Sequence, residues 1–154
     1  MWKDQKLALK TKLRLFDSIM ISVLLYGCET WKSFKDVELR VRRFESNCLR
    51  KKRIRWQQHV TEGEARRKSG QESVIEKIRR RRWMYFGPVL CMPDGRLPKE
   101  CLNWTPEGSR RPKETYRRTM TKEMEAAGII MNDALQLAQD CRQWRDFVAT
   151  LWNP

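Results

Sequence analysis

The sequence predicts an all-α protein, and three observations lead to this prediction. Apolar residues recur at three- and four-residue spacing over long stretches, as on one face of an amphipathic helix. Candidate capping residues and glycines separate these stretches. Four of the six prolines gather in residues 93–112. We therefore expect a helical bundle over residues 1–91, a proline-rich irregular loop over 92–112, and a smaller helical segment over 113–154.

The first stretch, residues 6–34, reads as one long helix whose apolar stripe nearly encircles its middle turns. Gly27 lies inside it, which indicates either a close approach of another helix or a helix end near residues 26–28. Asp36 is placed to begin a second helix over residues 37–53. Its inner face carries apolar side chains and its outer face and exit are strongly basic.

Capping signals mark the middle of the chain. Thr61 and Glu64 form a capping box for a short helix over 62–68. Gln71 or Ser73 then begins the helix that contains four consecutive arginines. We expect this helix to kink or stop near Gly87, because the ring of Pro88 would clash with the carbonyl of the preceding turn.

The sequence of the C-terminal part predicts one irregular segment followed by helices. Residues 93–112 hold at most a short extended piece over 97–104. Pro112 suits the first turn of a helix that runs to about Ala127, with Gly128 as its C-terminal cap. Asp140 and Gln143 resemble a capping box, so two helices are expected to meet there. The aromatic residues beyond are core or a docking face; they are Trp144, Phe147 and Trp152.

Positive charge is concentrated in the first three quarters of the chain. The 33 Lys and Arg outnumber the 19 Asp and Glu, for a net charge of +14 and a pI near 10.0. From Thr119 onward there are three Lys or Arg against five acids, a charge of −2, so residues 1–118 carry +16. A localised basic excess of this size is typical of a nucleic-acid-binding surface.

Three basic clusters contain aromatic residues, a combination in which guanidinium groups pair with phosphates while rings stack on bases. We expect them to converge in one cationic trough, with Trp56, Trp83 and Tyr116 stacking. A competing interpretation places Trp83 in the core of an amphipathic helix. The candidate nucleic-acid-binding residues are Arg50, Lys51, Lys52, Arg53, Arg55, Trp56, Arg79, Arg80, Arg81, Arg82, Trp83, Arg110, Arg111, Lys113, Tyr116, Arg117 and Arg118.

The motifs indicate a binding module rather than an enzyme. The glycines are scattered, His59 is the single histidine, no cysteine pair has zinc-knuckle spacing, and paired carboxylates are not evident. We therefore expect no catalytic residue, metal, cofactor or small-molecule substrate. Five widely spaced cysteines without a signal peptide favour reduced thiols in the nucleus or cytoplasm. No stretch is apolar enough to span a membrane.

Several blocks, taken in order, resemble the end of a non-LTR retrotransposon (LINE-class) reverse transcriptase. The likeness runs from about Leu7 to Trp152. The blocks are LLYGCETW, RRFESNCLR, VTEGEARRKSG, RRWMYFGPVLCM, RLPKECLNW, RRPKETYRRTM and AQDCRQWRDFV. The chain departs from the family at Pro88, where the family usually has His, and at Cys91 and Cys141, where it has Arg.

The resemblance implies a thumb that grips a template–primer duplex, followed by a segment that binds element RNA and target DNA. The palm and the endonuclease would lie upstream of Met1, so RNA-directed DNA synthesis would belong to a parent protein. The expected partners are the RNA and/or DNA backbone and the upstream polymerase domains. Two alternatives are a protein-interaction segment that docks onto those domains and a small basic nuclease.

Overall fold

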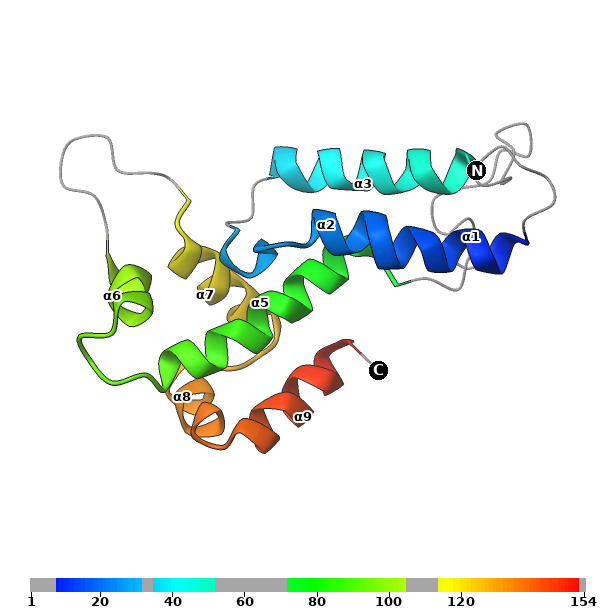
Figure 1. Ribbon diagram of the computed structural model, residues 1–154. Helices are drawn as coiled ribbons and strands as arrows, with labels where there is room; N and C mark the ends of the chain where they lie inside the picture. Colours follow the sequence, from blue (N-terminus) through cyan, green and yellow to red (C-terminus); the bar gives the residue numbers. More distant parts are fainter. Residues whose placement is uncertain (1–7, 32–34, 52–71, 105–113, 153–154) are drawn as a thin grey trace, which may run out of the picture. The chain divides into compact units, whose positions relative to one another are not determined.

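The computed structural model describes residues 8–31, 35–51, 72–104 and 114–152, and every regular element in these ranges is a helix (Figure 1). The predicted all-α class is therefore confirmed. The described residues group into two compact units. The first comprises residues 8–28, 35–51 and 72–78; the second comprises 29–31, 79–104 and 114–152.

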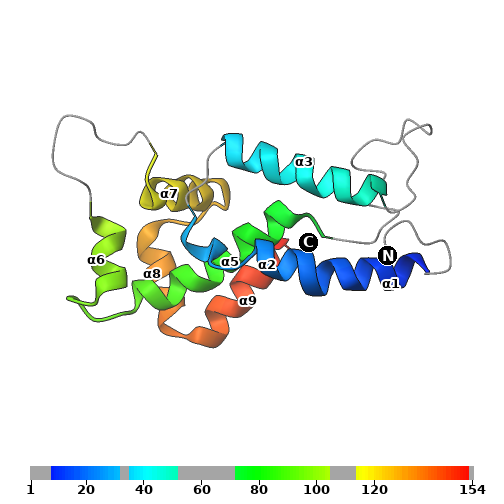
Figure 2. The ribbon, with the colours of Figure 1, turned by 45° about the horizontal axis from the view of Figure 1, so that its top comes forward.

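The first unit consists of α1 (Leu9–Leu15), the π-helical η1 (Phe16–Ile21), α2 (Ser22–Leu24), α3 (Lys35–Lys51) and the first turn of α5 (Val74–Leu90). Figures 1 and 2 show α3 antiparallel to the α1–α2 stretch. Phe16 stacks on Phe44 with ring centroids 6.4 Å apart. The buried Glu45 carboxylate accepts a hydrogen bond from the Val74 amide at 3.3 Å, which satisfies an N–H group at the start of α5.

The first helical stretch ends at Leu24, and Gly27 lies in the turn that follows, which settles the alternative that the sequence left open. Gly27 adopts a φ of +66°, in the left-handed region that favours glycine, and a Cβ built there would meet nothing within 4 Å. The glycine is therefore needed for the turn beyond the helix end and not for a close helix approach. A 3-10 turn, η2 (Cys28–Thr30), follows. The prediction of one helix over 6–34 is wrong because the helix ends at Leu24 and the chain turns at Gly27.

The core of the second unit lies among α5, α7 (Tyr116–Ala126), α8 (Met131–Gln139) and α9 (Cys141–Trp152). Trp83 stacks on Trp144 with ring centroids 5.9 Å apart, and the Trp144 indole N–H donates to the Trp83 carbonyl at 3.0 Å. Phe147 and Trp152 also pack against this core, as predicted. The division between units falls inside α5, between Ile78 and Arg79, rather than at the predicted residue 91, because the second half of α5 buries its apolar face here.

Two predicted helix ends, the start of α9 and the end of α7, are confirmed by their capping contacts. Asp140 Oδ1 accepts from the amides of Arg142 at 2.7 Å and Gln143 at 3.4 Å, so two helices meet at this residue. Gly128 has a φ of +70° and ends α7 in a Schellman motif, in which the Ile129 amide donates to the Met124 carbonyl at 3.1 Å.

The start of α7 and the region of Pro88 differ from the prediction. Helix α7 begins at Tyr116 rather than near Pro112, because Thr115 is extended and its side chain caps the Arg118 amide at 3.2 Å. Helix α5 continues through Pro88 to Leu90 instead of stopping near Gly87. Pro88 is exposed and lies two residues before the end of the helix, and its missing N–H group removes a single intrahelical hydrogen bond, the one to the Met84 carbonyl.

Residues 97–103 are helical and not extended. Helix α6 (Leu97–Asn103) has Pro98 in its first turn, where proline removes only an N–H group that has no intrahelical partner. The amides of Lys99 and Glu100 both donate to the Arg96 carbonyl, at 2.9 and 3.0 Å. The predicted helix over 62–68 lies outside the described residues. Within the described ranges, no helix is both long enough and apolar enough to cross a membrane.

Candidate nucleic-acid interface

The four consecutive arginines lie on α5, and their helical geometry gives each a different environment. Successive residues of an α-helix are rotated by about 100°, so four in a row point around the whole helix. Arg82 points inward, with its side chain only 3% exposed, and donates to Glu123 Oε1 at 2.5 Å. Trp83 donates its indole N–H to the other oxygen of the same carboxylate at 2.9 Å. Glu123 therefore satisfies two buried donors of α5 at once.

Two sequence predictions in this cluster are corrected by that geometry. Trp83 is 1% exposed and stacked on Trp144, so its ring offers no face to a nucleic-acid base. The interpretation of Trp83 as a core residue is the one that the structure supports. Arg82 is likewise held inside the protein by Glu123 and is not available to a phosphate.

The other arginines of the run reach the surface. The side chain of Arg79 is 41% exposed and lies 4.0 Å from Glu123; that of Arg81 is 47% exposed and lies 3.9 Å from Glu29. The carboxylates in these two contacts are mostly buried, with Glu123 17% and Glu29 30% exposed. Arg80 is half-buried.

The third cluster is described from residue 114 onward, where it forms the start of α7. Arg117 and Arg118 are exposed, and Arg117 donates to Asn103 Oδ1 at 2.6 Å. Tyr116 is half-buried. Its hydroxyl is fully buried and has no hydrogen-bond partner among the described residues. Burial raises the pKa of this hydroxyl above its ordinary value, and nearby Arg82 opposes the shift only partly.

The remaining predicted site residues lie where the structure describes no side chain. Arg50 and Lys51 end α3, but their side chains are outside the description. The other residues of this kind are Lys52, Arg53, Arg55, Trp56, Arg110, Arg111 and Lys113. Convergence of the three clusters in one trough stays a prediction. What the structure does bring together is α5 and α7, through the contacts of Glu123 with Arg79, Arg82 and Trp83.

The structure adds exposed cationic residues and a cavity to the residues chosen from the sequence. Arg42 and Arg43 are exposed on α3, within a predicted basic face but outside the predicted cluster. A cavity lies between η2, α5, α6 and α7. Sequence reasoning missed the cavity because it predicted an extended segment where α6 forms.

None of the cysteines, all of which lie in the described ranges, forms a disulfide, and the described residues bring together no group of three or more potential metal ligands. Cys28 is buried, as expected for a thiol that acts as a small apolar residue. Cys91, Cys101 and Cys141 are exposed instead. Burial and the neighbouring Cys141 raise the pKa of the Cys91 thiol, against the opposing effect of Lys99.

Comparison of the chain with protein-family models, curated proteins and solved structures found no match.

Proposed function

We propose that this chain binds nucleic acid through its phosphate backbone, as the thumb and post-thumb region of a non-LTR retrotransposon reverse transcriptase. The observation that carries the proposal is the set of surface guanidinium groups on two neighbouring helices of the second unit. Arg79 and Arg81 on α5 are each more than 40% exposed, and Arg117 and Arg118 on α7 are exposed. The order of sequence blocks supports the link to the retroelement family.

Binding through phosphates has a defined physical signature. Each Lys or Arg that neutralises a phosphate releases a condensed counterion, so affinity falls as salt rises. If roughly 6–10 phosphates are contacted, affinity falls about 10³–10⁵-fold between roughly 50 and 200 mM salt. Phosphate contacts carry no base information, so we expect little dependence on sequence. Polymerisation is assigned to the parent protein.

The test is fluorescence anisotropy with a labelled RNA and a labelled DNA over a salt series. The double variant Arg117→Gln/Arg118→Gln should reduce the slope of log affinity against log salt by about 1 for each arginine. Arg82 is left intact, because replacing it would disturb the core. The matched control is Arg142→Gln/Arg145→Gln, which removes two exposed arginines of α9 in the acidic part of the chain.

The control variant should bind with an unchanged salt slope. A salt-independent affinity of the wild-type chain would contradict phosphate binding. Equal losses of affinity in the two double variants would show that binding depends only on net charge and that α7 does not contact the nucleic acid specifically.

A second candidate function, docking onto polymerase domains of a parent protein, is favoured by an apolar surface on the first unit. Four residues near the end of its first helical stretch are exposed at helical spacing, with Val23 at 74% and Tyr26 at 87%; the other two are Ile19 and Met20. Val23→Ser/Tyr26→Ser should abolish binding to a purified polymerase palm domain and leave RNA binding unchanged. If this variant still binds the palm domain, the apolar surface is not the docking site.

A further inference from the structure

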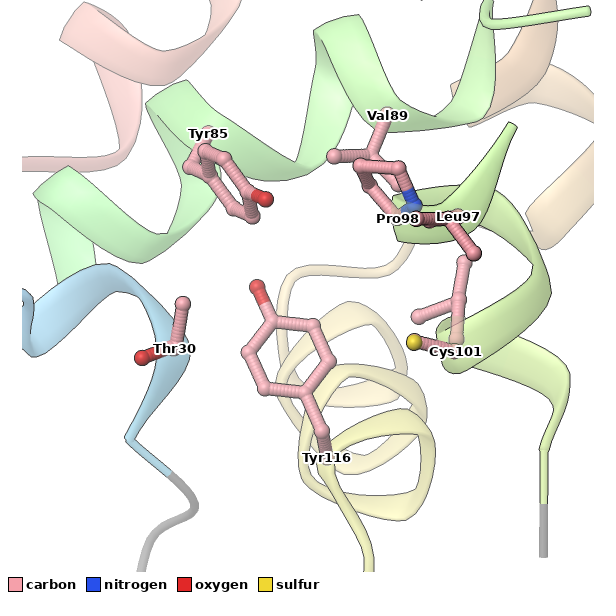
Figure 3. A pocket seen from close by; sticks show the side chains of 8 residues that line it. Thr30, Tyr85, Val89, Leu97, Pro98, Cys101 and Tyr116 are labelled. Carbon is pink, nitrogen blue, oxygen red and sulfur yellow. The ribbon is translucent and has the colours of Figure 1, made fainter.

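A cavity of about 400 Å³ opens in the second unit, between η2, α5, α6 and α7 (Figure 3). This volume lies in the range of small-molecule sites. Its lining is mostly apolar, with Val89, Leu97 and Pro98 among its walls. The rings of Tyr85 and Tyr116 form two further walls. The lining contains no charged side chain, so the cavity suits a neutral, flat group.

The Tyr116 hydroxyl is a polar group in this apolar cavity that needs a hydrogen-bond partner. Figure 3 shows the hydroxyl groups of Tyr85, from α5, and Tyr116, from α7, pointing into the same space. The Tyr116 hydroxyl is buried and has no hydrogen-bond partner within the described ranges. Nearly all buried polar groups in folded proteins are hydrogen-bonded, and leaving one unpaired is destabilising. A bound group with a hydrogen-bonding edge would supply the missing partner.

Cationic side chains flank the cavity although none lines it. Arg81 precedes Tyr85 by one turn of α5 and is 47% exposed. Arg117 follows Tyr116 directly and reaches Asn103 at the end of α6, at 2.6 Å. A ligand that placed a neutral ring in the cavity would thus bring its outer part close to guanidinium groups. A nucleotide has this division, with a neutral aromatic base and an anionic phosphate.

We propose that the cavity receives one unstacked base of a bound nucleic-acid strand, with Tyr85 and Tyr116 contacting the base and Arg81 and Arg117 contacting the flanking phosphates. This inference rests on the proposed function and adds a base-binding subsite to it. Aromatic rings accept every base on their π-faces. The hydroxyl of Tyr116 hydrogen-bonds an edge of the base.

The test uses a free nucleoside, which has no phosphate and so probes the cavity separately from backbone binding. The 154-residue chain is treated with N-ethylmaleimide in the presence of millimolar 2-aminopurine riboside, and alkylation of each cysteine is followed by mass spectrometry. Cys101 lines the cavity and is exposed, whereas Cys141 is exposed at the start of α9 and does not line it. The riboside should slow alkylation of Cys101 several-fold and leave that of Cys141 unchanged.

Tyr116→Phe removes one hydroxyl and should weaken riboside binding about tenfold, the effect of one lost hydrogen bond. Tyr26→Phe is the matched control, because Tyr26 is 87% exposed and belongs to the first unit. It should leave the affinity unchanged. Quenching of 2-aminopurine fluorescence gives an independent measure of binding for both variants.

The possible results separate this inference from the proposed function. If the riboside fails to protect Cys101 while oligonucleotides bind with the expected salt dependence, the base site is refuted and the proposed function stands. If no oligonucleotide binds, both fail. Equal protection by N-acetyltryptophanamide would overturn the inference in favour of a site for a protein side chain. Protection by the riboside alone, together with loss in Tyr116→Phe, supports it.

Discussion

Gly87→Ala is the most informative single change, because two opposing effects decide whether it raises or lowers the free energy of unfolding. Alanine is favoured over glycine inside a helix by about 1 kcal/mol. A Cβ at residue 87, however, would lie 2.5 Å from Cε2 and 2.6 Å from Cδ1 of Trp144. Carbon atoms in contact are about 3.5–4.0 Å apart, so the indole ring must move.

Movement of Trp144 disturbs the centre of the second unit. The ring is 2% exposed, donates to the Trp83 carbonyl at 3.0 Å and packs on both Trp83 and Phe86. Adding a methyl group to a close-packed core costs about 1–3 kcal/mol. Loss of the indole hydrogen bond adds about 1 kcal/mol. After the gain in helix propensity, we expect Gly87→Ala to destabilise the protein by about 2 kcal/mol.

Urea unfolding followed by circular dichroism measures this change, with the midpoint falling and the denaturant slope unchanged. Ala149→Gly, at an exposed position of α9, calibrates the propensity effect and should cost about 1 kcal/mol. The double variant Gly87→Ala/Trp144→Phe should lose less than the sum of the single variants, because the smaller ring relieves the clash. A stabilised Gly87→Ala, or strictly additive losses, would refute the reasoning.

Three further predictions concern single side chains. Glu123→Gln removes the charge partner of the buried Arg82 and should cost about 3 kcal/mol in urea unfolding; a loss below about 1 kcal/mol would contradict a buried pair. Asp140→Ala removes the cap between α8 and α9 and should cost about 1 kcal/mol, whereas Asp140→Asn should be nearly neutral in thermal unfolding. The raised pKa of Tyr116 means that the folded chain retains a proton that the unfolded chain releases above the ordinary value of 10.0, so stability should fall by about 1.4 kcal/mol per pH unit above it. Tyr116→Phe removes the titrating hydroxyl, so the free energy of unfolding of this variant should fall less steeply with pH above 10.0. Unfolding measured over that pH range checks this, and an equally steep fall in the variant and the wild type would contradict it.

Helix content and several helix ends followed from the sequence, because they depend on interactions within a few residues. Glycine at a left-handed position and a capping aspartate act locally, so Gly128 marked the end of α7 and Asp140 the start of α9 correctly. Proline misled the prediction twice. The proline-rich segment over 93–112 was predicted to be irregular although Pro98 occupies the first turn of α6, and Pro88 is tolerated near the end of α5.

The candidate site was predicted less completely, for a geometric reason. Four adjacent arginines on a helix cannot all face solvent, and the sequence does not say which one finds a buried carboxylate. Arg82 does so because Glu123, forty-one residues away in the chain, lies opposite it on α7. The cavity was missed because its walls come from four elements, one of which was predicted in the wrong conformation.

The sequence by itself determined that the chain is helical, basic over residues 1–118, and divided by local caps, since composition, periodicity and capping act over short distances. Only the tertiary structure decided that Trp83 is core, that Arg82 is paired inside, and that Tyr116 borders a cavity. These outcomes depend on contacts between helices remote in sequence. The pattern along one helix predicts which side chains lie on its buried face, whereas the residues that those side chains contact depend on how the helices pack.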